Sequence, residues 1–199
     1  MRAYQLLVST LLLAQPCVSS ATNLQPTPKP GLWETETTTL INGENIMQQL
    51  EHMRSLLLLN MSESQREQAA DLFDSAPPLI ERACITRTLA STMTTPEAVM
   101  AQAQQRTPDC ALDSQQSSAN TLQFSGQCND PASFVGDLHG EIRFVSSSEI
   151  RFSFQGNGNY RLPFSMQSAA HGEDDVISQT TISRWLSSDC GTIKPKPAF

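Results

Sequence analysis

The sequence contains few charged residues and very little lysine. Asp, Glu, Lys and Arg make up 17% of the 199 residues, and only three residues are lysine. Proteins that bind nucleic acids need clustered Lys and Arg to contact phosphates, so the composition excludes that class of partner. Ser, Thr, Gln and Asn together supply 65 residues. Many of them alternate with apolar residues and are expected on the solvent sides of strands, as at Thr35, Gln123, Ser125, Ser153, Ser165 and Gln179.

No apolar run is long enough to span a membrane. The longest, at residues 6–14, covers nine residues, whereas a transmembrane helix needs about 20. Arg2 precedes this run and small residues ending at Ala21 follow it, so residues 1–21 have the pattern of a cleaved secretory signal peptide. Cys17 follows a proline, which disfavours lipid attachment at that cysteine. We therefore expect an exported protein with no membrane span in its mature chain.

No C-x-x-C pair is present, so neither a zinc ribbon nor a thioredoxin-like redox site is indicated. In an exported chain, the four cysteines after residue 21 indicate two disulfides. Four cysteines permit three pairings. A β-hairpin centred on Ala119 would place Cys110 opposite Cys128, within bonding distance. This geometry favours Cys110–Cys128, which leaves Cys84 for Cys190.

Helical patterns are confined to the residues before Thr107. A Pro-rich lead-in, expected to be extended and mobile, covers residues 22–30, and β-branched residues predict a strand over 31–41 that ends at Asn42-Gly43. Three helices are then predicted: one begins after Asn45, one runs from Ser62 to Phe73, and one runs from Thr95 to Arg106. A short strand at Cys84-Ile85-Thr86 separates the last two.

The second half alternates between apolar and polar residues with a period of two, which predicts sequential hairpins. Turns are predicted at residues 146–148 and at Gly156-Asn157-Gly158-Asn159, and the last strand is expected to end near Trp185. Residues 192–199 read as a flexible tail.

These patterns predict one α+β domain over residues 31–191. Its expected architecture is an antiparallel β-meander sheet with two or three helices packed on one face, stapled by the disulfides. Trp33 and Trp185 are expected either to pack together in the core or to flank a pocket.

The segment Pro30-Gly31-Leu32-Trp33-Glu34 resembles the opening strand of a family of small exported proteins of Gram-negative bacteria, known only as a domain of unknown function. The resemblance continues through Cys84-Ile85-Thr86, the Cys110 to Cys128 hairpin and Ser188-Asp189-Cys190, and it spans about residues 30–191. It implies a periplasmic, β-rich domain with no catalytic residues to carry over. A Leu/Met/Gln helical pair replaces the Met-rich stretch that is common after the first strand in this family.

The first predicted helix is rich in leucine and methionine. Its candidate ligand-binding residues are Met47, Leu50, Met53 and Leu57. Adaptable Met-rich surfaces bind apolar ligands or partner segments, but the same stripe also suits a helix that covers the open face of the sheet. The functional hypothesis is a non-enzymatic module of cell-envelope maintenance, with an apolar ligand or an envelope protein as its partner.

The alternative hypothesis is a hydrolase or a metal-dependent enzyme that uses Asp137, His139 and Glu141. These residues alternate along one strand and therefore project from one face, with Arg143 next in the series. One histidine and two flexible carboxylates make a thin ligand set, so no metal or cofactor is expected. His171, beside three acidic residues, reads as part of a solvent turn, and His52 as helix surface.

Overall fold

The computed structural model describes residues 22–66, 80–131, 134–160 and 175–195. The predicted signal peptide with Cys17, the predicted second helix beyond Arg66, the segment around Ser165 and His171, and the residues from 196 onward lie outside the described residues. The elements are β1 (Gly31–Ile41), β2 (Glu44–Asn45), α1 (Ile46–Leu59), β3 (Ile80–Ile85), α3 (Arg87–Thr92), α4 (Pro96–Arg106), β4 (Cys110–Ser118), β5 (Thr121–Asn129), β6 (Phe134–Ser146), β7 (Glu149–Tyr160) and β8 (Asp175–Ser187).

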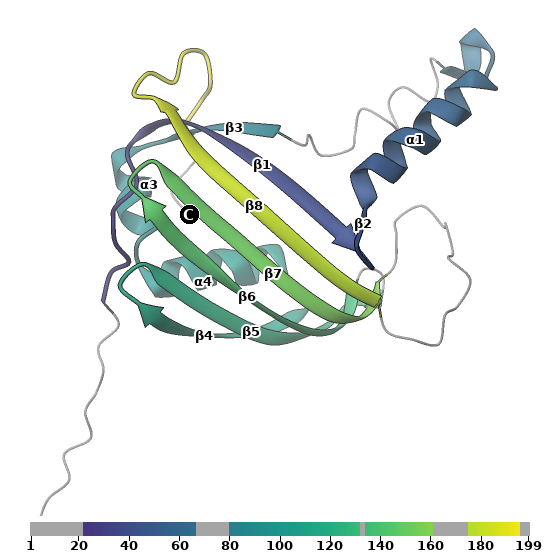
Figure 1. The fold of residues 1–199 in the computed structure, drawn as a ribbon. Coiled ribbons are helices and arrows are strands. Elements are labelled where there is room, and N and C mark those ends of the chain that lie inside the picture. Colours follow the sequence, from purple (N-terminus) through teal and green to yellow (C-terminus); the bar gives the residue numbers. More distant parts are fainter. Residues whose placement is uncertain (1–21, 67–79, 132–133, 161–174, 196–199) are drawn as a thin grey trace, which may run out of the picture.

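All the strands belong to one antiparallel sheet with the order β2-β1-β8-β7-β6-β5-β4 (Figure 1). β3 pairs with β1 along residues 31–36 and β2 pairs with it at residues 40–41, while β8 pairs with the other edge of β1. β4 to β8 follow the chain as a meander, and β1 joins this meander beside the last strand. The predicted fold class, an antiparallel meander sheet with short helices and two disulfides, is confirmed.

The β1–β2 hairpin turns where the sequence predicts. Asn42 has φ of 52° and Gly43 has φ of 83°, the positive values that a two-residue turn between antiparallel strands requires. Asn and Gly adopt these angles more easily than other residues do. The Asn42 side chain also bonds to the last strand, since its Nδ2 donates to Asp175 Oδ1 at 2.9 Å and its Oδ1 accepts from the Val176 N–H at 2.9 Å.

The β4–β5 hairpin is centred as predicted, and it fixes one disulfide. Opposed residues sum to 238 from Cys110↔Cys128 to Gln116↔Leu122, with a register shift next to the turn. The structure contains both bridges that the sequence favours, Cys110–Cys128 and Cys84–Cys190. The second bridge ties β3 to the segment that follows β8.

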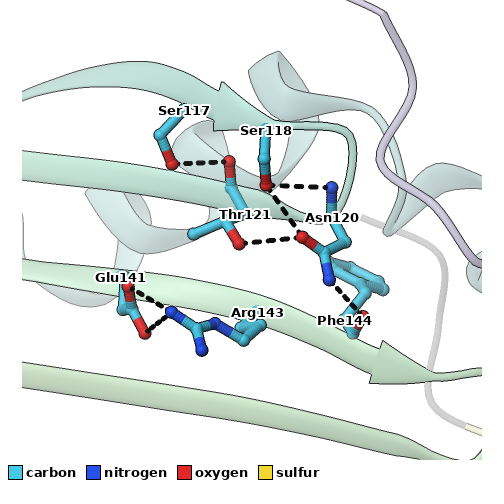
Figure 2. Close-up of polar contacts among 7 residues, drawn as sticks. All are labelled: Ser117, Ser118, Asn120, Thr121, Glu141, Arg143 and Phe144. Atoms are coloured by element: carbon cyan, nitrogen blue, oxygen red, sulfur yellow. Dashed lines mark hydrogen bonds and ion pairs between the residues drawn. The ribbon is translucent and has the colours of Figure 1, made fainter.

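The turn of this hairpin is held by Asn120 (Figure 2). Its Oδ1 accepts from Ser118 Oγ at 2.8 Å and from Thr121 Oγ1 at 3.0 Å, and its Nδ2 donates to the Phe144 carbonyl at 3.4 Å. The Phe144 N–H returns a bond to the Asn120 carbonyl at 2.8 Å. One amide side chain therefore joins the β4–β5 turn to β6.

The core lies between the sheet and the helices behind it in Figure 1. Its buried residues are Leu24, Trp33, Ile85, Leu89, Ala90, Leu122, Phe144 and Ile150, and Val99 and Met100 of α4 pack against them. Leu89 and Ala90 belong to α3, so α3 and α4 cover one end of one sheet face.

The Pro-rich lead-in is docked on the domain, so the expectation of a mobile segment is wrong. Leu24 is 0% exposed and belongs to the core cluster. The N–H groups of Leu24, Gln25 and Lys29 donate to the carbonyls of Thr94, Ala119 and Ser147 at 2.7–2.8 Å. These bonds join the lead-in to three separate loops. Burial of Leu24 adds apolar contact with the core, which the Pro-rich composition of the segment does not predict.

The predicted turn at Gly156–Asn159 is also wrong, because these residues continue β7. Gly158 lies opposite Gly136 of β6, and a Cβ at Gly158 would lie 2.2 Å from the Val135 carbonyl oxygen. Glycine here permits a close approach of two strands instead of a turn. The neighbouring turn at residues 147–148 is confirmed.

Each described helix begins next to a residue that is typical of helix N-caps. Thr95 is the N-cap of α4 with Pro96 at the first helical position, as predicted. The unpredicted α3 begins after Thr86, whose Oγ1 accepts from the Leu89 N–H at 3.1 Å.

Asn45 caps α1, because its Oδ1 accepts from the N–H groups of Met47 and Gln48 at 3.0 and 3.2 Å. At Ser62, the side chain of Gln65 accepts from both the N–H and the hydroxyl, consistent with the predicted start of the second helix.

The Leu/Met helix does not cover the sheet. α1 leaves the end of β2 and projects away from the strands (Figure 1). Among the described elements its principal contacts are with β1 and β2, at its own N-terminal end. Helical periodicity identifies an apolar helix but does not specify what the helix contacts, so the pattern does not decide whether α1 covers the sheet or projects from it. No helix in the described ranges has the length and hydropathy needed to cross a bilayer.

Candidate functional site

The first candidate surface is the projecting helix α1. Leu56 is 48% exposed and Leu59 is 75% exposed, and residues three apart lie on one helix face. Met47 is half-buried near the start of the helix. Leu50, Met53 and Leu57 belong to the same helix, and their side chains lie outside the described part of the structure. The helix therefore presents leucine to solvent beyond its first turn.

The charge on α1 is low. Its sequence, IMQQLEHMRSLLLL, holds one glutamate, one histidine and one arginine, and neither end carries the acidic or basic residues that often complement a helix dipole. His52 is exposed on this helix, as predicted.

The second candidate surface is the sheet face opposite α3 and α4. The strand register defines it, because side chains of successive residues alternate between the two faces. Trp33, Leu122 and Phe144 point to the helix side. Asp137, His139, Glu141 and Arg143 therefore share the other face, as the sequence predicts.

A shallow hollow of about 840 Å3 crosses this second face over β4 to β8. Two cross-strand rows of side chains form its walls, and the backbone of the row between them forms its floor. One wall is Asp113, Ser125, His139, Gln155 and Ser178, and the other is Gln115, Gln123, Glu141, Ser153 and Thr180. We call this feature the polar trough.

The walls of the polar trough carry unused hydrogen-bonding groups. Within the described ranges, Glu141 is the one wall residue with a side-chain partner: its carboxylate pairs with Arg143 at 2.9 Å (Figure 2). The side chains of the other nine wall residues form no hydrogen bond or ion pair with the described chain. Their donors and acceptors therefore face solvent in two parallel rows.

Polar side chains on the helix-side face are paired with one another instead. Thr35 and Ser183 hydroxyls lie 2.8 Å apart, and those of Thr37 and Thr181 lie 3.1 Å apart. Gln179 Nε2 donates to Thr181 Oγ1 at 3.3 Å. Thr35 and Gln179 were expected on the solvent side, but they lie on the face that also carries the core. Gln123, Ser125 and Ser153 do lie on the opposite face, in the trough walls.

The Asp137, His139 and Glu141 series is divided by the trough. His139 lies in one wall, Glu141 lies in the other and is paired with Arg143, and Asp137 falls outside the lining. No group of three or more His, Cys, Asp or Glu residues suited to a metal ion occurs in the described ranges. In the described sheet, Asp137, His139 and Glu141 therefore do not converge on one point.

The pattern of the trough could have been found from the sequence. Two turns between strands of the trough are predicted correctly, near Ala119 and at residues 146–148, and opposed residues follow by reflection about each turn. Reflection aligns Asp113 with Ser125 and His139 with Gln155, as the structure does. The alternation of polar residues along one strand does not by itself show these rows, because each row runs across the strands.

The sequence pattern of the family described as "Protein of unknown function (DUF3617)" matches residues 28–190. No curated protein and no solved structure matches the chain.

Proposed function

The chain belongs to the DUF3617 family, whose function is unknown, and we propose that it is a non-enzymatic binding module that holds an apolar segment of a partner protein on α1. The observation that carries this proposal is the exposure of Leu56 and Leu59 on a helix that stands away from the sheet.

An isolated helix of 14 residues is marginally stable in water, since most helices gain their stability from tertiary packing. α1 receives its cap from Asn45 and contacts β1 and β2 at one end. Each fully buried leucine contributes roughly 1.5–3 kcal/mol, so a partner that covers Leu56 and Leu59 would supply the packing that the described sheet does not.

A protein segment suits α1 better than an anionic membrane surface does. Helices that lie on membranes carry several Lys or Arg residues on their polar face. Arg54 is the single basic residue in α1, and Glu51 offsets its charge. The flexible methionines of the helix favour adaptable contact with apolar side chains. The occupant we propose is therefore an amphipathic helix or an apolar strand of another protein.

The proposed location is the periplasm. Residues 1–21 have the pattern of a secretory signal, and the two disulfides suit an oxidising compartment. A role in maintaining the cell envelope is part of the proposal, because a binding module exported to the periplasm would meet envelope proteins there.

Site-specific photo-crosslinking tests this proposal. A benzoylphenylalanine is placed at position 59 of the full-length chain in cells that export it, and adducts are identified by mass spectrometry. We expect one discrete protein adduct, with a yield that falls when Leu56→Gln is added. The matched control places the same group at the exposed position 127 of β5.

Equal adducts from positions 59 and 127 would contradict the proposal, as would adducts with lipid alone or no adduct at position 59. Loss of the adduct on adding Leu56→Gln, with an unchanged circular dichroism spectrum, would support docking on this helix face.

A further inference from the structure

The polar trough lies on a different part of the molecule from α1, and it carries a separate inference. We propose that it binds an uncharged glycan chain, laid across β4 to β8 with its hydroxyl and amide groups bonded to the two walls.

The spacing of the walls fits such a chain. Each strand contributes one side chain to each wall, so the wall groups repeat at the strand separation of about 4.8 Å. A pyranose unit in an extended glycan advances by a length close to this separation. An extended peptide advances by about 3.3 Å per residue, so its repeat does not match the strand separation at which the wall groups recur.

The hydrogen-bonding chemistry of the walls is that of neutral polar recognition. Three amides (Gln115, Gln123 and Gln155) and four hydroxyls (Ser125, Ser153, Ser178 and Thr180) supply both donors and acceptors. Their capacity is not used within the described chain, in contrast to the paired hydroxyls on the helix side. Sugar hydroxyls, which both donate and accept, match this mixture.

The charge of the trough excludes anions as ligands. No Lys or Arg belongs to its lining, and its two carboxylates are Asp113 and Glu141. Phosphate recognition requires basic side chains or free backbone N–H groups. Over β5 to β8 the floor supplies none of the latter, because each of these strands is paired with a neighbour on both sides.

A peptide partner is disfavoured because the backbone of the floor over β5 to β8 is already hydrogen-bonded between strands. Peptides bind sheets by adding a strand at an open edge, where unpaired backbone groups are available. The trough runs over the face of the sheet from the edge strand β4 to β8, and its walls are side chains. A peptide laid there would have to leave many of its own amide groups to water.

Titration of the ¹⁵N-labelled protein with chitotetraose, followed by NMR, tests the inference. This probe is uncharged and carries both hydroxyl and acetamido groups. We expect saturable shifts at millimolar concentration in the side-chain amide signals of Gln115, Gln123 and Gln155. Cellotetraose serves as a second neutral probe that lacks the acetamido groups, and a Gly-Ser decapeptide serves as the peptide control.

Gln123→Ala and its matched control Gln127→Ala change the same residue type, on the same strand and the same sheet face, inside and outside the trough. Loss of one hydrogen bond should weaken chitotetraose binding about fivefold for Gln123→Ala, or about 1 kcal/mol. Gln127→Ala and the α1 change Leu59→Gln should leave it unaltered.

Several results would overturn the inference: no shift with either saccharide, equal weakening by Gln123→Ala and Gln127→Ala, or shifts with the decapeptide alone. Because Leu59→Gln serves as a control here, failure of the glycan site and failure of α1 docking are distinguishable.

Discussion

Trp33 of β1 lies directly opposite Trp185 of β8, although the two residues are 152 positions apart in the chain. The Nε1–H of each indole donates to the docked lead-in, Trp33 to the Lys29 carbonyl at 2.8 Å and Trp185 to the Pro30 carbonyl at 3.1 Å. The Lys29 ammonium also lies 4.9 Å from the centre of the Trp185 ring. The tryptophan pair therefore holds the lead-in against the paired strands β1 and β8.

The two tryptophans should differ in their contribution to stability. Trp33 is 1% exposed and Trp185 is half-buried, so Trp33→Ala should lower the free energy of unfolding by about 3–5 kcal/mol and Trp185→Ala by less. Trp33→Phe keeps most of the apolar contact but leaves the Lys29 carbonyl without its donor, at a cost of about 1–3 kcal/mol. Urea denaturation measures these values. Equal losses for the two alanine variants would contradict the assigned burial.

The two disulfides should stabilise unequally. The Cys110–Cys128 bridge spans 18 residues and the Cys84–Cys190 bridge spans 106. If loss of loop entropy in the unfolded chain dominates, replacing both cysteines of a bridge by alanine should cost about 3 kcal/mol for the short loop and about 5 kcal/mol for the long one. Chemical denaturation under oxidising conditions checks the order, and a larger loss for the short loop would show that another effect dominates.

Gly158 tests whether residues 156–159 form a strand. Gly158→Ala would place a methyl group 2.2 Å from the Val135 carbonyl oxygen, and the backbone shift needed should cost about 1–3 kcal/mol. Asn157→Ala changes an exposed strand residue and should alter stability by less than about 0.5 kcal/mol. In a tight turn with positive φ at this position, Asn157→Ala would itself be costly, so thermal denaturation of the two variants separates the interpretations.

Asn120 should be the most sensitive position of the β4–β5 turn. Asn120→Ala removes the acceptor for Ser118 and Thr121 and the donor to the Phe144 carbonyl. Because Thr121 is buried, its unpaired hydroxyl adds to the cost, and the expected loss is about 1–3 kcal/mol. Ser117→Ala removes one long bond of 3.4 Å and should be nearly neutral. Urea midpoints compare the two variants, and equal shifts would argue against the assigned role of Asn120.

Local chemistry predicted much of the fold. Asn42-Gly43, Thr95-Pro96 and the reflection about Ala119 each led to the observed element, because a turn or cap depends on a few adjacent residues. The prediction of a turn at Gly158 is wrong because glycine occurs both in turns and at close strand contacts, and only the facing strand distinguishes the two.

Tertiary placement was less predictable. Leu24 in a Pro-rich segment carries no periodic pattern, yet it is buried in the core. The leucines of α1 have the pattern of a covering helix, yet Leu56 and Leu59 are exposed. In both cases the sequence shows that a side chain is apolar but not which surface covers it.

α1 stands apart from the sheet (Figure 1), and we propose that it is open to a partner. Amide hydrogen exchange of the isolated full-length protein tests this claim most directly. The amides of Leu56 to Leu59 should exchange much faster than those of Leu122 and Phe144 in the core strands. Protection of α1 equal to that of the core strands would show that the helix is already packed, and would contradict the account.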